Sequence, residues 1–369
     1  MPKDRPHIAF YLYNLSGGGA ERITVNLMHN FIQLGLKIDL VINTKTNSPY
    51  LPMVPPEVRV LELKLGSRKG IPKLITYLRQ EQPLVLLSSL HYNNEIAILA
   101  KYLAVVPTKV MVCEHNTLSL RAKRQNSGLK WAILLTRMLY PLSNGILAVS
   151  HSVAQDLAQV SGIPLKRINT IYNPVISSGL LEQSKEPLDH PWFAPSEPPV
   201  ILGVGRLNEQ KDFSTLIRAF ALVRQEKPAR LMILGQGAEE KKLKALAKEL
   251  DIEKDVAFPG FQSNPYPFIA KAAVFALSSL WEGLPTVLIE AMALGTPVVA
   301  TDCPGGSAEI VNNGKYGSLV PMGDSQALAE EILSILSGNF KLVDSAWLEQ
   351  FTLKTASQKY LDFLGICMN

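Results

Sequence analysis

The chain has 369 residues, of which 47% are hydrophobic and 19% charged, so it can bury the cores of two ordinary domains. It contains no run of about 18 apolar residues, which argues against a membrane-spanning helix. The three cysteines, Cys113, Cys303 and Cys367, match no paired or metal-binding spacing, so we expect reduced thiols in a cytoplasmic protein.

Charge is distributed unevenly along the chain. Residues 1–178 carry 20 Lys and Arg against 9 Asp and Glu, whereas residues 179–369 carry 17 against 23. The basic first half predicts an anionic partner, such as nucleic acid, a membrane surface or a phosphorylated acceptor. Solubility alone is the other interpretation. Because no nucleic-acid recognition module is evident, we expect no nucleic-acid partner.

Apolar runs and helical patterns alternate in the first half. The run Ile8–Leu15 leads into a glycine turn at Gly17–Gly19 and has no small-residue cleavage site, so it predicts a strand rather than a signal peptide. The spacing of apolar residues in Ala20–Leu34 predicts an amphipathic helix, which Gly35 ends. Alternating units of this kind predict a parallel sheet covered on both faces. Further strands are expected at Lys37–Asn43, Pro83–Ser88, Lys109–Glu114 and Gly145–Val149.

A proline-rich stretch at 174–199 predicts a linker, after which a second series of strands and helices begins. The expected strands are Val200–Val204, Arg230–Leu234, Val256–Phe258, Val274–Leu277 and Val298–Ala300, with helices at Ser214–Val223 and Glu239–Leu250. The prediction is therefore an α/β protein with two facing Rossmann-like domains and a cleft between them. We expect an N-terminal domain at 1–178 with a linker to about 199, a C-terminal domain at 200–350, and a helix at 351–369 that packs back toward the first domain.

The segment Trp281–Met292 is the most informative for function. It puts Glu282 in a Gly-Pro turn and Glu290 about two turns into the helix that follows, with Pro285 in the first helical turn. The start of a helix attracts anions through its unpaired N–H groups and its dipole, and a carboxylate can accept hydrogen bonds from a diol. A phosphate beside a diol describes a nucleotide sugar. The simpler interpretation is an ordinary helix start with two solvated acids.

Five segments, in this order, resemble glycosyltransferase family 4 of the GT-B fold. The resemblance is strong over most of Val200–Asp324 and weaker in the first domain. It is carried by Gly18–Arg22, by Gly203–Leu207 with Lys211–Phe213, by Ile233–Gly237, by Phe258–Phe261, and by the spacing of Glu282 and Glu290.

The resemblance implies a retaining glycosyltransferase that moves a hexose or an N-acetylhexosamine from a nucleotide sugar, with UDP favoured over GDP as the carrier. Arg206 and Lys211 would bind the donor diphosphate, Glu290 the ribose hydroxyls, and Glu282 the sugar. No cofactor is implied, and no Asp-x-Asp metal motif is found, so we expect no metal site. The other expected donor-binding residues are Gly18, Gly19, Gly205, Gly235, Gly237, Phe261, Gln262, Gly283, Leu284, Pro285 and Thr286.

Two features of the first domain extend this prediction. The loop Ser16–Gly19 resembles a phosphate-cradling loop, although a plain tight turn is the alternative. His115 follows the predicted strand Lys109–Glu114, so it lies at the carboxyl edge, where the family often has a histidine that contacts the donor sugar. A structural role is the alternative for His115, and Glu114 either orients it or caps the strand. His91 and His151 have similar settings with less support.

No enzymic nucleophile is evident, so we expect front-side attack, with the leaving phosphate helping to deprotonate the acceptor. Glu282 and Glu290 are not expected to act as the carboxylate pair of a double-displacement glycosidase. The acceptor is expected to be a saccharide, or a sugar linked to polyprenyl diphosphate. The basic and apolar segment Arg121–Leu142 predicts peripheral contact with an anionic membrane at its cytoplasmic face, or else an ordinary buried helix after a basic loop.

Two other functions remain open at the level of sequence. One is a UDP-N-acetylglucosamine 2-epimerase, although such an enzyme lacks the ordered pattern of Arg206, Lys211, Glu282 and Glu290. The other is a non-catalytic protein that binds nucleotide sugars, against which the intact set of charged residues argues.

Overall fold

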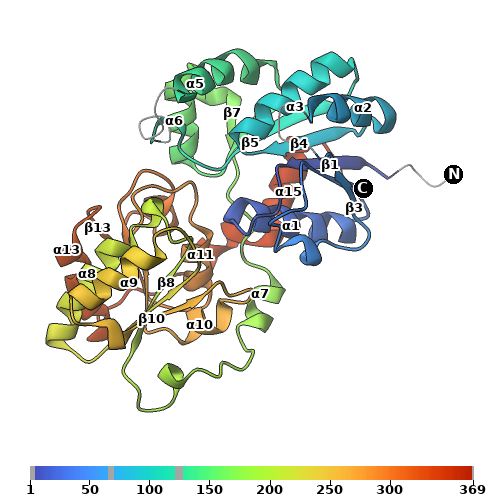
Figure 1. Cartoon of the computed structure of the whole chain (residues 1–369). Helices are drawn as coiled ribbons and strands as arrows, with labels where there is room; N and C mark the ends of the chain where they lie inside the picture. Colours follow the sequence, from blue (N-terminus) through green and yellow to red (C-terminus); the bar gives the residue numbers. More distant parts are fainter. Residues whose placement is uncertain (1–4, 65–69, 121–127, 368–369) are drawn as a thin grey trace. The chain divides into compact units, whose positions relative to one another are not determined.

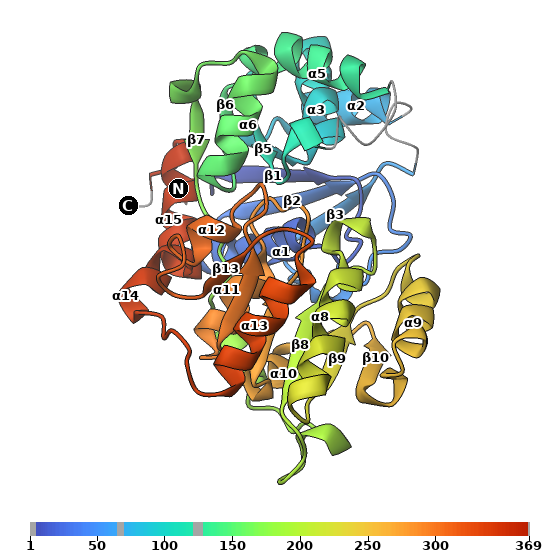
Figure 2. The same cartoon turned by 90° about the vertical axis from the view of Figure 1, so that its left-hand side faces the viewer.

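The computed structural model describes residues 5–64, 70–120 and 128–367, with side chains from Ile133 onward in the last range. The chain forms two compact units. One contains the residues up to Val175 together with the segment that begins at Phe351, and the other runs from Ile176 to Gln350. Each unit is built on one parallel sheet with helices on both faces (Figures 1 and 2). Parallel strands need covered faces because both of their faces carry apolar side chains.

The first unit contains a seven-stranded sheet in the order β3-β2-β1-β4-β5-β6-β7. The chain first moves outward from β1 to β2 and β3, and then returns to place β4 on the other side of β1. The strand order therefore reverses between β1 and β4. The strands are β1 His7–Leu12, β2 Lys37–Ile42, β3 Arg59–Glu62, β4 Val85–Ser89, β5 Lys109–Glu114, β6 Gly145–Ala148 and β7 Ile168–Thr170.

Helices α2, α3, α5 and α6 lie on one side of this sheet, and α1 lies with α15 on the other (Figure 1). Helix α15 comes from the end of the chain, and its Tyr360 is buried. The chain enters and leaves this unit side by side, because the Val175 N–H donates to the Phe351 carbonyl at 2.9 Å. The helices are α1 Gly19–Gln33, α2 Ile71–Glu81, α3 His91–Ala104, α5 Gly128–Leu139, α6 His151–Ser161 and α15 Leu353–Leu364, with 3₁₀ turns η1 Leu51–Met53, η2 Tyr140–Leu142 and η3 Leu165–Arg167.

The second unit contains a six-stranded parallel sheet in the order β10-β9-β8-β11-β12-β13. Its strand order reverses between β8 and β11, in the same way as the first sheet. The strands are β8 Val200–Val204, β9 Arg230–Leu234, β10 Val256–Gly260, β11 Val274–Leu277, β12 Val298–Thr301 and β13 Ser318–Val320.

The stretch interpreted as a linker carries structure of its own in this unit. Helix α7 packs on α10, and the Asn264 side-chain amide donates to the Gln183 carbonyl at 3.1 Å. The helices are α7 Ser178–Gln183, α8 Phe213–Glu226, α9 Glu240–Glu249, α10 Tyr266–Lys271, α11 Thr286–Ala293, α12 Ser307–Ile310, α13 Ser325–Leu336 and α14 Ser345–Leu348. The 3₁₀ turns are η4 Pro191–Phe193, η5 Glu209–Lys211, η6 Glu253–Asp255 and η7 Glu349–Phe351.

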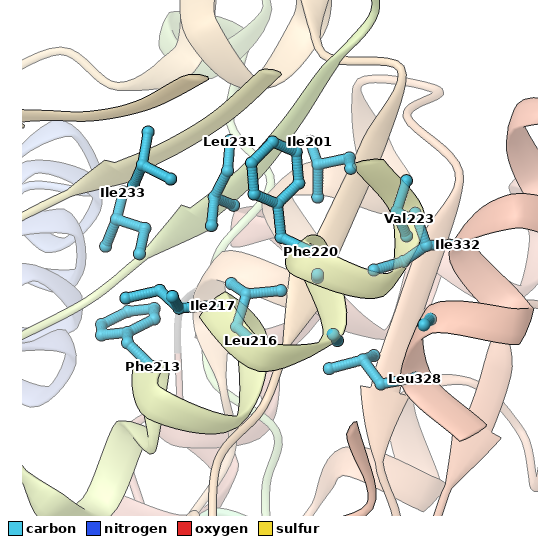
Figure 3. Packing of buried hydrophobic residues seen from close by; sticks show 14 of the residues in the cluster. Ile201, Phe213, Leu216, Ile217, Phe220, Val223, Leu231, Ile233, Leu328 and Ile332 are labelled. Atoms are coloured by element: carbon cyan, nitrogen blue, oxygen red, sulfur yellow. The ribbon is translucent and has the colours of Figure 1, made fainter. Parts of the chain in front are cut away.

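Helix α8 forms the centre of the core on one face of the second sheet. Figure 3 shows Phe220 and the neighbouring side chains of α8 between β8, β9 and α13. Phe220 is fully buried, as are Leu216 and Ile217 on the same helix. Burial of each such side chain contributes about 2 kcal/mol, and together they hold the loop that precedes α8 against the sheet.

The predicted α/β class with two parallel sheets is confirmed. Most predicted elements differ from the observed ones by one to three residues at their ends, where hydrogen bonding rather than side-chain pattern decides. Helix α1, for example, begins at Gly19 instead of Ala20. Within the described part of the chain, no helix is both long enough and apolar enough to cross a bilayer.

Candidate active site

The predicted donor residues of the second unit follow the strands at which the sheet order reverses. The loop after β8 carries Gly205, Arg206 and Lys211, and the loop after β11 carries Glu282 and Gly283. Ligands of open parallel sheets bind outside the carboxyl ends of the strands at such a point, because the two loops diverge there and leave room. Sequence analysis and topology therefore indicate the same edge of the sheet.

Lys211 and Glu282 form an ion pair in this site, with 2.5 Å between Nζ and Oε1. Both side chains are largely withdrawn from solvent, at 16% and 8% exposure. The Ser279 hydroxyl donates to the same Oε1 at 2.6 Å and so fixes the carboxylate from the other side. Arg206, in contrast, is exposed, and its guanidinium forms no ion pair among the described residues. The site thus offers one unpaired cation and one cation held in place by a carboxylate.

The two loops are also joined through their backbones. The Leu280 N–H donates to the Gln210 carbonyl at 2.8 Å, and the Gln210 side-chain amide donates to the Trp281 carbonyl at 2.9 Å. The Ser278 hydroxyl donates to the Lys211 carbonyl at 2.8 Å. These bonds fix the position of Lys211 relative to Glu282 before any ligand arrives, which reduces the entropy lost on binding.

Helix α11 begins at Thr286, and Pro285 is the residue before it. The expectation that Pro285 lies within the first turn was therefore wrong by one position. Pro285 makes no side-chain hydrogen bond to the start of α11, and the first N–H groups of a helix have no partner within the helix itself. Gly283, Leu284 and Pro285, which lead into this helix, are buried.

Glu282 and Glu290 are 6% and 3% exposed, so the alternative of two solvated acids is wrong. Glu290 is the fifth residue of α11 and lies in its second turn, slightly closer to the helix start than expected. Carboxylates are almost never buried without partners or a function, because burial penalises their charged form. Their burial therefore favours binding roles over general solvation.

A loop that was not predicted forms hydrogen bonds with the backbone of Glu282 and Gly283. The segment Cys303–Gly306 follows β12, and the Pro304 carbonyl accepts from the Glu282 N–H at 2.9 Å. The Gly306 N–H donates to the Gly283 carbonyl at 2.8 Å. Gly305 has a φ of +128°, and a Cβ there would lie 2.2 Å from the Glu282 carbonyl oxygen. The available signal for this loop was the pair of consecutive glycines, Gly305 and Gly306, a short distance after a predicted strand.

Gly235 and Gly237 also bring two loops together. A Cβ on Gly235 would lie 1.9 Å from the Gly205 carbonyl oxygen, and one on Gly237 would lie 2.2 Å from that of Leu207. The Leu207 N–H in turn donates to the Gln236 carbonyl at 3.0 Å. These glycines therefore let the loop after β9 pack against the loop that carries Arg206, which is a sufficient reason for glycine at both positions.

Phe261 and Gln262 follow β10 at the edge of the same sheet. The Phe261 side chain is 41% exposed, which is high for a phenylalanine. The Gln262 side-chain amide donates to the Pro259 carbonyl at 3.3 Å, at the end of β10. Both residues lie at the carboxyl edge, as the prediction required, two strands away from β8.

In the first unit, Gly18 is the residue before α1, and Gly19 is its first residue. The loop follows β1, at the reversal of that sheet. The Ser16 hydroxyl donates to the Glu21 carboxylate at 3.1 Å, so this helix start already holds an acid in its first turn. A carboxylate in the first turn already supplies the negative charge that a helix start favours, so the loop is better suited to neutral hydroxyls than to a phosphate.

His115 follows β5 at the carboxyl edge of the first sheet and is 9% exposed. Burial lowers the pKa of its imidazole to about 4, so the ring is neutral at pH 7. Its Nε2 is buried and has no hydrogen-bond partner among the described residues. A neutral imidazole with a spare ring nitrogen can donate to or accept from a sugar hydroxyl, depending on its tautomer.

Glu114 does not orient His115 through its side chain. Its Oε1 instead accepts hydrogen bonds from the Tyr140 hydroxyl and, at 3.2 Å, from the Asn94 side-chain amide. His91 lies in the same buried group, with its Nδ1 3.7 Å from Glu114 Oε1 and its Nε2 3.4 Å from Glu95 Oε1. Sequence analysis gave His91 less support than His115 and did not predict that it lies near Glu114 and Glu95. The group anchors the end of β5, from which His115 extends.

The predicted membrane segment Arg121–Leu142 lies partly outside the described residues. Arg121, Lys123 and Arg124 fall within residues 121–127, and the side chain of Trp131 is also outside the description. Helix α5 accounts for most of the remainder. The prediction that it is simply a buried helix is wrong for its second half, since Met138 is 61% exposed.

Two further observations concern a surface pocket and possible metal ligands. A surface pocket of about 370 Å³ is lined by Asn144, Arg167, Asn169 and Asp362 among others, at the amino edge of β6 and β7, and it includes none of the predicted residues. Across the described ranges, no three His, Cys, Asp or Glu side chains are grouped as metal ligands would be.

The two-sheet architecture is that of the GT-B fold. The crystal structure of HepE from Anabaena, in complex with UDP and glucose, matches 98% of this chain and 100% of its own with a TM-score of 0.83 at 21% identity. At this level of identity, the similarity to HepE shows that the two proteins share a fold.

Sequence comparison identifies the family. The model "Glycosyltransferase Family 4" matches residues 17–178, and the model "Glycosyl transferases group 1" matches residues 184–346. An N-acetylgalactosamine-N,N'-diacetylbacillosaminyl-diphospho-undecaprenol 4-alpha-N-acetylgalactosaminyltransferase of Campylobacter jejuni is 28% identical over 89% of this chain and 90% of its own. A lipopolysaccharide 1,6-galactosyltransferase of Salmonella typhimurium is 25% identical over 90% of each. The chain belongs to the family 4, group 1 glycosyltransferases, and it is a glycosyltransferase rather than an epimerase.

Proposed function

We propose that this enzyme transfers a hexose or an N-acetylhexosamine from a UDP-sugar, with retention, to a hydroxyl of a lipid-linked saccharide during cell-surface glycan synthesis in the cytoplasm. The domain at 200–350 binds the nucleotide sugar, and the domain at 1–178 binds the acceptor. The observation that carries the proposal is the partly buried Lys211–Glu282 pair, whose carboxylate Ser279 fixes a few residues before the start of α11, where Pro285 gives no side-chain cap.

The donor diphosphate is bound by Arg206, Lys211 and the N–H groups of Thr286 and its neighbours. An ammonium group has three N–H donors, so Lys211 can stay bonded to Glu282 and still donate to phosphate oxygens. The exposed guanidinium of Arg206 supplies a planar pair of donors for the second phosphate. Glu290 accepts from the ribose hydroxyls, and Glu282 with the backbone at Gly283 and Leu284 binds the sugar. Phe261 and Gln262 contact the base.

Five of the glycines are assigned to the shape of the donor site. Gly205, Gly235 and Gly237 keep the loop of Arg206 close to the sheet, and Gly18 and Gly19 let the loop after β1 approach the transferred sugar. His115 donates or accepts one hydrogen bond at a hydroxyl of that sugar as a neutral ring.

In the reaction, the bond between the anomeric carbon and the diphosphate oxygen breaks, and its electron pair leaves with UDP. The acceptor oxygen bonds to the same face of the anomeric carbon, and its proton passes to the leaving phosphate. Negative charge grows on the diphosphate as the bond breaks, so preorganised cations and N–H groups stabilise the transition state more than the ground state. We propose that Arg206 and Lys211 supply this charge without a metal ion, so that transfer persists in EDTA.

The proposed acceptor follows from the names of the relatives. The Campylobacter jejuni relative is named for a diphospho-undecaprenol acceptor and an N-acetylgalactosaminyl group, and the Salmonella typhimurium relative for lipopolysaccharide. Both names describe glycan assembly on a lipid, which supports a polyprenyl-diphosphate-linked saccharide here.

The donor is tested by thermal unfolding in the presence of UDP- and GDP-sugars, followed by mass analysis of candidate acceptors with the best donor. The winning donor should raise the Tm of the wild type, and the shift should be lost in Lys211→Ala and Glu290→Ala. Arg218→Ala, a change of an exposed arginine on α8, is the matched control and should keep the shift. A donor shift without transfer or hydrolysis would favour a non-catalytic binding protein.

The mechanism is tested separately by quenching the reaction and analysing the intact protein by mass. Front-side attack predicts only the unmodified mass of the chain. A covalent glycosyl-enzyme on any residue would overturn this mechanism, although it would leave the donor assignment intact.

A further inference from the structure

The loop that carries His115 is held by hydrogen bonds on both sides of this residue. His115 directly follows β5, and Leu118 and Ser119 come three and four residues later. Loops at the carboxyl edge of a parallel sheet are generally more mobile than the strands, because fewer of their backbone groups are paired. A residue in such a loop has a fixed position only where neighbouring elements bond to its backbone.

Before His115, the end of β5 is bonded to the start of α3. The Cys113 carbonyl accepts from the Leu90 N–H at 3.2 Å and from the Asn94 side-chain amide at 3.0 Å. Leu90 has a φ of +75°, which is a strained value for a bulky side chain. Strain of this kind persists only where surrounding contacts determine the backbone. The position of Cys113 is therefore fixed by α3 and by the loop that precedes it.

After His115, a single carboxylate of α6 holds the loop. Oδ2 of Asp156 accepts from the Leu118 N–H at 2.5 Å and from the Ser119 N–H at 3.2 Å. Hydrogen bonds to an ionised acceptor are about twice as strong as those between neutral groups. Within the described ranges, no cation forms an ion pair with Asp156, so its bonds to the loop are not shared with a basic side chain.

Helix α6 is a firm base for this carboxylate. It packs against β6 and β7 (Figures 1 and 2). The Ser150 hydroxyl caps its start and accepts from the Val153 N–H at 3.1 Å. Val153 and Leu157, which flank Asp156 along the helix, are each 1% exposed. Asp156 thus extends from a well-packed helix, so it can hold the loop rather than move with it.

Only His115, Asn116 and Thr117 lie between the two bonded segments. A short segment that is fixed at both ends has few accessible conformations, so the backbone of His115 is confined. None of the bonds on either side uses the imidazole ring. Its Nε2 is buried and has no hydrogen-bond partner in the described part of the chain, so the ring is held in place with one nitrogen available to a ligand.

We propose that Asp156 is a positioning residue for sugar transfer, whose carboxylate, with Asn94 on the other side of the loop, holds the His115 ring where it meets the transferred sugar. Asp156 acts through the backbone of the loop and does not itself bind the substrate. The effect on transfer rests on the proposed function of His115. The effect on the position of the ring follows from the hydrogen bonds alone.

The first test measures the position of His115 without any substrate. NMR of the full-length protein labelled at histidine follows the titration of the His115 ring, whose signal is identified by its absence in His115→Ala. Burial lowers the pKa of this ring to about 4. Asp156→Ala releases the loop and should raise the pKa to above about 5, because water reaches the ring. Asp156→Asn should leave it near 4, since both N–H groups donate to one oxygen, which an amide oxygen can replace.

The second test measures kcat/KM for the donor by UDP release in single and double variants. Asp156→Ala should lower kcat/KM by about 10- to 100-fold, because a displacement of about 1 Å in a group that orients substrate costs on the order of 100-fold. In the His115→Ala background the same change should alter kcat/KM by less than about twofold, since the ring that it positions is absent. Asp156→Asn should stay within a few fold of the wild type.

Asp324→Ala in the second unit is the matched control. Asp324 is also half-buried and accepts from a backbone N–H at the start of a helix, that of Ala327 at 2.9 Å. Both alanine variants should lower the Tm by similar amounts, and only Asp156→Ala should change kcat/KM and the pKa of His115.

Three results would overturn the proposal. They are an unchanged pKa of His115 in Asp156→Ala, an equal fall in kcat/KM with and without the His115 ring, and a loss in Asp156→Asn as large as that in Asp156→Ala. Wild-type activity of His115→Ala, together with a raised pKa in Asp156→Ala, would instead refute the proposed function of His115 and confirm that Asp156 holds the ring.

Discussion

Replacing Gly305 by alanine is expected to damage catalysis far more than stability. The new Cβ would lie 2.2 Å from the Glu282 carbonyl oxygen, whereas a carbon and an oxygen without a covalent bond stay at least about 3.3 Å apart. The backbone of Glu282 must therefore move by about 1 Å. Its N–H bond to the Pro304 carbonyl, now 2.9 Å, would be lost or lengthened in the process.

A shift of 1 Å in a group that orients substrate costs on the order of 100-fold in rate. We therefore expect kcat/KM for the donor, measured by UDP release, to fall about 100-fold in Gly305→Ala. The carboxylate of Glu282 remains bonded to Lys211 and Ser279, so the second unit should still fold.

The matched control is Gly295→Ala. Gly295 follows α11, has a φ of +75°, and has open space where its Cβ would be. Alanine there has the strain of a left-handed helix end, about 1–2 kcal/mol, without a clash at the site. Both variants should lower the Tm, and only Gly305→Ala should lower kcat/KM by more than a few fold. Equal kcat/KM in Gly305→Ala and the wild type, or equal losses in both variants, would refute the argument.

Three further predictions concern the ion pair, the buried histidine and the core. Lys211→Met leaves Glu282 buried without its cation and should destabilise the protein by about 3–5 kcal/mol in denaturant unfolding. The double variant Lys211→Met/Glu282→Gln should recover most of that stability but none of the activity. A single variant as stable as the wild type would contradict this prediction. Because burial holds the pKa of His115 near 4, below its unfolded value of about 6.5, the unfolded chain binds the proton first. The stabilising effect of neutral His115 is therefore present above pH 6.5 and is lost as the pH falls toward 4. The stability of His115→Asn should decline less over that window, by up to about 3 kcal/mol, and parallel pH profiles would exclude the shift. Phe220→Ala should cost about 3–5 kcal/mol of unfolding free energy, while Phe261→Ala, at an exposed position, should cost little stability but weaken donor binding.

The sequence predicted the two sheets because apolar strands and amphipathic helices alternate with clear periods. Strands β5, β8, β9 and β11 were predicted at their observed limits, since each is a short apolar run with turn residues on both sides. Strands β3, β7 and β13 were not predicted. They are short strands at or next to the sheet edges, and their half-exposed residues give no apolar run.

The residues around Glu282 could likewise be predicted only in part from the sequence. Its carboxylate and that of Glu290 could be singled out because they flank a Gly-Pro turn before a helix. The roles of Ser279, Gln210 and Gly305 could not, because they depend on which loops meet at the carboxyl edge. A hydrogen bond between residues 71 positions apart, such as that from Gln210 to Trp281, leaves no periodic trace in the chain.

The sequence by itself determined the fold class and the family resemblance and singled out the charged residues that we propose bind the donor, since these depend on local pattern and on short motifs. Tertiary structure alone decided that Lys211 is paired with Glu282, that His115 is buried and neutral, and that Asp156 bonds to the loop after His115. Those properties are set by burial and by distances between segments remote in sequence. Desolvation and packing depend on contacts in the folded chain, so they cannot be read from the order of the residues alone.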